Sequence, residues 1–181
     1  MSHRRLLNVP RHRQQELAAR FAWLPRVHEN EKGPEVQVIS VSVFDHWLSP
    51  EEACQLLEAV PPDERKRRDT LMESFCKRMI AETEVLSYAL RGRKKDRLVF
   101  RTFNSSDALT NYCRPNGAKS LGHREWHVVS PELECAFLEG WDHTCHFFFV
   151  TPGIEEKAMH WAAQSKVHIL RHTAKAAMSH I

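Results

Sequence analysis

Glycine is scarce in this sequence, and its cysteines do not follow the spacing of the common cysteine-dependent folds. The 181 residues include six glycines, and no Gly-x-Gly-x-x-Gly or Walker A loop is present. Such loops hold phosphates through bare backbone, so nucleotide-dependent chemistry is not expected. The five cysteines are an odd number without a Cys-x-x-Cys pair. This argues against a disulfide framework, and we expect free thiols in a reducing, intracellular compartment.

Long hydrophobic segments are also missing. No apolar run reaches the roughly 18 residues of a membrane-spanning helix, and no signal-peptide hydrophobic region precedes a small-residue cleavage site. We therefore predict no membrane association. Hydrophobic residues make up 42% and charged residues 27% of the chain, close to the average of soluble globular proteins. A chain of this length is expected to form one domain that folds without disulfides or metal.

Charge is segregated along the chain, although its net value is only +3. Residues 1–28 have six arginines and one acid, and residues 29–64 have one lysine and nine acids. Residues 65–101 then have twelve basic residues and five acids. Alternating blocks of this kind are typical of a polarised surface that meets a charged partner. Solvated faces that carry charge in runs are the alternative.

The first 34 residues are predicted to form a basic N-terminal arm and linker ahead of a single α+β domain over residues 35–181. Three apolar residues share one face of a short helix: Leu17, Phe21 and Leu24. Pro25 ends this helix, and Gly33-Pro34 form a turn. An arginine-rich, acid-poor start is also typical of a mitochondrial presequence. The expected location is thus the cytoplasm, or the mitochondrial matrix if this segment is a presequence, and an ordinary first helix is the third interpretation.

The remaining segments predict an α+β fold, with a small mixed or antiparallel sheet and helices packed on one of its faces. The predicted strands are apolar runs bounded by turn residues: Val36–Val43, Leu98–Phe100 with Phe103, Glu125–Val129, Cys135–Leu138 and His146–Thr151. The shorter helices have clear starts. Ser49 caps one helix, Asn104–Asp107 cap another that runs through Tyr112, and Gly153 opens a third.

A longer helix is predicted from Asp63 to about Leu90, with a basic cluster at each end. Apolar residues keep helical spacing along it: Leu71, Phe75, Met79, Leu86 and Leu90. Burial of this stripe would turn the opposite face outward and hold the two clusters about 40 Å apart, at 1.5 Å per residue. We predict that nine basic residues bind a partner or nucleic acid: Arg65, Lys66, Arg67, Arg68, Arg91, Arg93, Lys94, Lys95 and Arg97. Phe100, Phe103 and Tyr112 are available to stack on bases.

Histidine and glutamate alternate in one predicted strand. His123, Glu125 and His127 would lie on the same face, because side chains alternate along a strand. Two imidazoles and a carboxylate are the ligands of mononuclear iron and of catalytic zinc sites. The sequence therefore suggests a zinc or iron site here, against the alternative of a solvated strand face.

No catalytic residue is predicted. Cys113 and Cys145 have histidines nearby in the sequence, but neither lies in a recognised nucleophile motif.

Several short motifs follow the order of those in a known enzyme family. They are Leu48–Glu52, Pro62–Arg65, Lys77-Arg78 and a helix to Leu90, together about a quarter of the chain. This part resembles the first half of two-lobed 4′-phosphopantetheinyl transferases. The magnesium-binding Gly-x-Asp of that family has no counterpart, and Asn104–Asp107 stand where the family has Asn-x-Ser-His. The resemblance thus implies a non-catalytic, degenerate relative, since no metal would hold the diphosphate of coenzyme A.

Two classes of function remain open. The first is a non-enzymatic binding or assembly protein that uses its segmented charge and basic helix to join a larger protein or ribonucleoprotein complex. The second is a small enzyme, either metal-dependent or a degenerate transferase. The missing motifs favour the first class.

Overall fold

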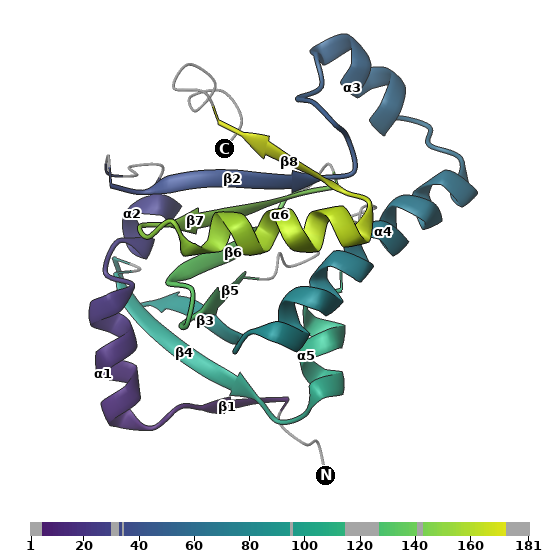
Figure 1. Ribbon diagram of the computed structural model, residues 1–181. Helices are drawn as coiled ribbons and strands as arrows, with labels where there is room; N and C mark the ends of the chain where they lie inside the picture. The colour runs from purple at the N-terminus through teal and green to yellow at the C-terminus, as the bar shows by residue number, and fades with distance from the viewer. Residues whose placement is uncertain are drawn as a thin grey trace.

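The computed structural model describes residues 5–29, 33, 35–94, 96–114, 127–140 and 143–172. These residues form an open sheet of eight strands, in the order β1-β4-β3-β5-β6-β7-β2-β8 (Figure 1). All neighbouring strands are antiparallel. The strands are β1 (Leu6–Asn8), β2 (Gln37–Ser42), β3 (Leu86–Arg91), β4 (Arg97–Phe103), β5 (His127–Ser130), β6 (Cys135–Glu139), β7 (Thr144–Phe149) and β8 (His168–Arg171). The predicted α+β class is confirmed.

The described residues also include six helices. They are α1 (Arg11–Arg20), α2 (Leu24–His28), α3 (Pro50–Leu57), α4 (Pro62–Glu82), α5 (Ser106–Tyr112) and α6 (Gly153–Ser165). The predicted helix starts are confirmed for two of them, because the Ser49 hydroxyl accepts from the Glu52 amide and the Ser105 hydroxyl accepts from the Ala108 amide. No helix in the described part of the chain is long and apolar enough to cross a membrane.

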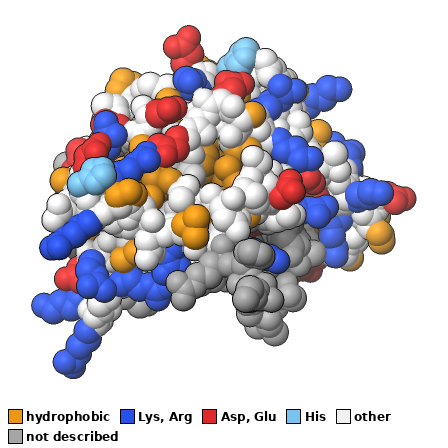
Figure 2. Space-filling model, turned by 90° about the horizontal axis from the view of Figure 1, so that it is seen from below, with side chains coloured by type: hydrophobic (Ala, Val, Ile, Leu, Met, Phe, Trp, Pro, Cys, Tyr) orange, Lys and Arg blue, Asp and Glu red, His pale blue; other side chains and the backbone are white. Residues whose placement is uncertain are grey.

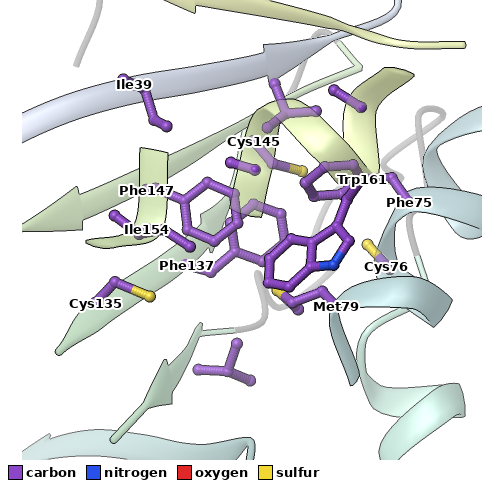
Figure 3. Close-up of a cluster of buried hydrophobic side chains, with 14 of the residues drawn as sticks. Ile39, Phe75, Cys76, Met79, Cys135, Phe137, Cys145, Phe147, Ile154 and Trp161 are labelled. Atoms are coloured by element: carbon purple, nitrogen blue, oxygen red, sulfur yellow. The ribbon is translucent and has the colours of Figure 1, made fainter. Parts of the chain in front are cut away.

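The first face of the sheet packs against α4, α5 and α6. Apolar side chains of β2, β5, β6 and β7 meet those of the helices around Phe75 and Trp161 (Figure 3). The rings of Phe137 and Phe147 stack with their centroids 4.2 Å apart. The Trp161 indole N–H donates to a carboxylate oxygen of Glu82 at 2.8 Å, so this fully buried ring keeps its hydrogen bond.

The second face packs against the N-terminal helices α1 and α2, where the sequence suggested a separate arm. Leu17, Phe21 and Leu24 are each at most 1% exposed and belong to one cluster with Leu98 and Phe100 of β4. The rings of Phe21 and Phe100 lie 5.9 Å apart between centroids. The structure thus differs from the expected layout, because helices cover both faces and the N-terminal segment forms part of the core.

Polar contacts also fix α1 to the body of the protein. The Gln14 side chain donates to the Phe100 carbonyl at 2.5 Å and accepts from the Phe100 amide at 3.0 Å. Arg13 pairs with Glu84, and Arg20 pairs with Glu134 at 2.9 Å. Part of the N-terminal positive charge is therefore neutralised within the domain.

The long helix α4 ends at Glu82, and the prediction that it continues to about Leu90 is wrong. Residues Leu86–Arg91 form β3, in which Leu86 and Tyr88 are buried against the second face. The spacing of four between Leu86 and Leu90 fits one face of a helix and also one face of a strand. The basic clusters predicted at the two ends of one helix therefore lie on different elements.

Candidate nucleic-acid interface

A hollow of about 310 Å³ opens on the first face of the sheet, over β1, β4 and β3 and beside α5. We call this hollow the arginine pocket. Its lining residues are Arg5, Leu6, Ser87, Tyr88, Ala89, Arg91, Val99, Arg101, Phe103, Ala108, Asn111, Tyr112 and Arg114. The buried core of this face takes its strand residues from β2, β5, β6 and β7. Among the described residues, α5 is the helix that lies beside β4 on that face, next to the hollow.

Successive side chains of a strand point to opposite faces of the sheet, so the same strand can line the pocket on one face and the second core on the other. In β4, Leu98 and Phe100 pack into the second core, while Val99, Arg101 and Phe103 point into the pocket. The register then places other pocket residues beside them. Arg101 lies opposite Ser87 of β3 and Asn8 of β1, and Phe103 lies opposite Leu6.

Four arginines surround this hollow, from four different segments of the chain. Arg5, Arg91 and Arg101 form no ion pair with any described carboxylate, and Arg114 has one long contact to Glu73 at 3.7 Å. Figure 2 views the molecule from the end of the sheet at which β1 lies, and Lys and Arg side chains are numerous on this face, with Asp and Glu side chains among them. Guanidinium groups present planar forks of N–H donors that match phosphate oxygens.

Aromatic side chains form one wall of the pocket. Phe103 of β4 and Tyr112 of α5 have ring centroids 5.1 Å apart at an interplanar angle of 58°. Both are half-buried, and Asn111 on the same helix is exposed. Rings of this kind stack on nucleic-acid bases, and an amide can donate to or accept from base edges. The sequence had singled out both rings for stacking.

Arg68 does not face outward as predicted. Its side chain is 6% exposed, and its guanidinium donates to Glu64 and to the Leu56 carbonyl at 2.7 and 2.6 Å. It also lies 5.0 Å from the centre of the Phe44 ring. Arg67 forms a bidentate ion pair with the same Glu64 carboxylate. Arg67 and Arg68 together lower the pKa of the Glu64 carboxyl to about 2. Arg68 therefore stabilises the start of α4.

The other predicted basic residues are divided between two surfaces. Arg65 and Lys66 are exposed on α4. Arg91 lines the arginine pocket and is paired across the β3–β4 hairpin with Arg97, while Arg93 and Lys94 are exposed in its turn. Lys95 lies outside the described residues. The structure thus brings only part of the predicted set together, and it adds Arg5, Arg101 and Arg114.

The predicted metal site is only partly within the described residues. His123 and Glu125 lie outside them, so the zinc or iron site stays a prediction. His127 lies on the second face, stacked on Tyr88 with centroids 5.8 Å apart and close to His28. In the described ranges, no three His, Cys, Asp or Glu residues are grouped so that they could hold a metal ion.

A serine–histidine network on the second face was not predicted. The Ser40 hydroxyl lies 2.7 Å from Nδ1 of His146 and 2.8 Å from Nε2 of His172. One hydroxyl proton can serve only one of these rings, so the other ring must donate to the oxygen. Ser40 has no exposed surface, and its contacts therefore link the chain after β8 to the sheet. Ser40, His146 and His172 are far apart in the sequence, so no local sequence pattern predicts these contacts.

The thiols considered as nucleophiles are buried. Cys113 and Cys145 are each at most 2% exposed, and burial raises the pKa of the Cys113 thiol to about 12. Burial also raises the pKa of Cys135 to about 12. The thiolate is the reactive form, and burial disfavours it at Cys113 and Cys135.

Comparison with known proteins finds no matching family model, no similar curated protein and no similar solved structure. The resemblance to 4′-phosphopantetheinyl transferases therefore rests on the short motifs alone. In the structure, these motifs begin α3 and α4 and continue within α4.

Proposed function

We propose that the protein binds RNA through the arginine pocket and joins a larger ribonucleoprotein complex as a non-enzymatic subunit. The observation that supports this most is the grouping of four arginines around one hollow that has an aromatic wall. The basic surface of α4 is a less suitable site, because Arg67 and Arg68 are paired with Glu64.

Electrostatics supports an anionic ligand at this pocket. Positive groups placed around one hollow repel one another, and that repulsion is strongest where solvent access is reduced. Arg101 is half-buried in the pocket, without an ion pair to any described carboxylate. A phosphate between these guanidinium groups would relieve the repulsion and accept several charge-assisted hydrogen bonds.

The ligand also needs apolar, planar groups to match the remaining lining. Phe103 and Tyr112 offer ring surface, while Ser87, Ala89 and Val99 form a floor of small side chains. Inorganic phosphate alone would leave this surface unused. A nucleic-acid strand supplies both kinds of group, since phosphates alternate with bases along it.

Titration of a fluorescein-labelled single-stranded RNA with the full-length protein tests this proposal. Fluorescence anisotropy should report a Kd of about 10⁻⁶–10⁻⁵ M at 50 mM salt, in the range of non-specific nucleic-acid binders. Each phosphate contact on a single strand contributes about 0.7 to the slope of log K against log salt, so contacts from four arginines predict a slope of up to about −3.

Absence of RNA binding at 50 mM salt would overturn the proposal, as would binding that does not respond to salt. Single-stranded DNA of the same sequence is the companion ligand. A weaker interaction with DNA would show that the 2′-hydroxyl contributes.

A further inference from the structure

We infer that the arginine pocket takes one unpaired nucleotide of a single-stranded RNA, and that the RNA chain continues from the pocket over β1 at the edge of the sheet. This inference rests on the proposed RNA binding and specifies the form of nucleic acid that the site accepts. It is argued from a second hollow, from the size of the pocket and from the side chains on its floor.

The second hollow lies next to the arginine pocket at the outer edge of the sheet. It measures about 520 Å³ and is lined by Arg5, Leu6, Leu7, Asn8 and Arg101. Arg5, Leu6 and Arg101 line both hollows. The two hollows therefore meet at a pair of arginines, which is where a phosphate joining two nucleotides would lie.

The side chains of β1, at the edge of the sheet, are suited to contact an RNA chain that crosses it. β1 has three residues, and of the strands that the structure describes it pairs with β4 alone. Asn8 lies beside Arg101 in the register and offers an amide, while Leu7 is 48% exposed and offers apolar contact. A polymer that leaves the pocket over β1 thus meets a hydrogen-bonding group and a surface for a second base.

The size of the pocket favours an unpaired base. Its volume of about 310 Å³ is at the small end of the roughly 300–1,000 Å³ found for small-molecule sites. This is room for one nucleotide and not for stacked base pairs. Bases in a duplex are covered on both faces by their neighbours, so a paired base cannot reach Phe103 or Tyr112 without leaving the stack.

The floor of the pocket allows a direct test of base insertion that leaves every charge in place. Ala89 lies on β3 in the floor, opposite Val99, and is half-buried. The substitution Ala89→Leu should fill the hollow while the four arginines remain. Ala81→Leu, at an exposed position on α4, is the matched control.

The experiment compares a labelled single-stranded RNA octamer with the same sequence held in a fully paired RNA duplex, by anisotropy at 50 mM salt. The wild-type protein should bind the single strand at least tenfold more tightly. Ala89→Leu should lose about tenfold for the single strand, the effect of one lost stacking contact, and little for the duplex. Ala81→Leu should match the wild type.

Equal binding of the two RNAs by the wild-type protein would overturn the inference and leave the proposed RNA binding standing. Unchanged single-strand affinity in a folded Ala89→Leu variant would also overturn it. The wild-type comparison decides the question even if Ala89→Leu does not fold. Failure of both RNAs to bind would overturn the proposed function and this inference with it.

Discussion

Replacing Phe21 by alanine is expected to lower the free energy of unfolding by about 3–5 kcal/mol, the usual cost of deleting a buried aromatic ring. Phe21 has no exposed surface, and its ring lies 6.0 Å from Trp23 and 5.9 Å from Phe100 between centroids. It therefore joins the N-terminal segment to β4. Urea denaturation followed by circular dichroism measures the change.

Leu7→Ala is the control for this prediction, because Leu7 is 48% exposed and such positions tolerate replacement within about 0.5 kcal/mol. If Phe21→Ala were no more destabilising than Leu7→Ala, the N-terminal segment would be the separate arm that the sequence first suggested.

Removal of residues 1–28 should likewise lower Tm strongly, since it would uncover Phe100 and Phe148 on the second face.

Changing Arg91 and Arg101 together to glutamine is expected to weaken single-stranded RNA binding by about tenfold to a hundredfold at 50 mM salt. Each lost phosphate contact should also reduce the slope of log K against log salt by about 0.7, so the pair should reduce it by about 1.4. Arg91 is exposed and Arg101 half-buried, and neither is paired with a described carboxylate. Circular dichroism should show that the fold is retained.

Arg65→Gln with Lys66→Gln is the matched control, since it removes the same charge from exposed positions on α4. This double variant should keep both the affinity and the salt slope close to those of the wild type. An equal loss in the two double variants would mean that RNA responds to the overall charge of the protein. A loss confined to the α4 variant would place the binding surface on that helix.

The fold class and several elements could be predicted because their signals are local. The β-branched run at β2 and the Ser49 cap of α3 need only neighbouring residues. The strand β3 was missed because Leu86 and Leu90 satisfy helical and strand spacing alike. The role of the N-terminal segment was also missed, since its apolar stripe was visible but its partner surface lies about 80 residues away in β4.

The candidate site was predictable only in part for the same physical reason. Arg91, Phe103 and Tyr112 were singled out from their residue types, and all three line the arginine pocket. Arg5 joins them because β1 pairs with β4, and Arg114 joins them because α5 packs beside that strand. The burial of Arg68 depends on Phe44 and the Leu56 carbonyl, which no local pattern indicates.

Ultraviolet crosslinking of the full-length protein to single-stranded RNA, with the crosslinked peptides identified by mass spectrometry, tests the central claim most directly. If RNA binds in the arginine pocket, the crosslinks should fall on peptides that contain Phe103 or Tyr112, the rings of its aromatic wall. Arg91→Gln with Arg101→Gln should remove them. Crosslinks confined to α3 and α4, or unaffected by this double substitution, would contradict the account.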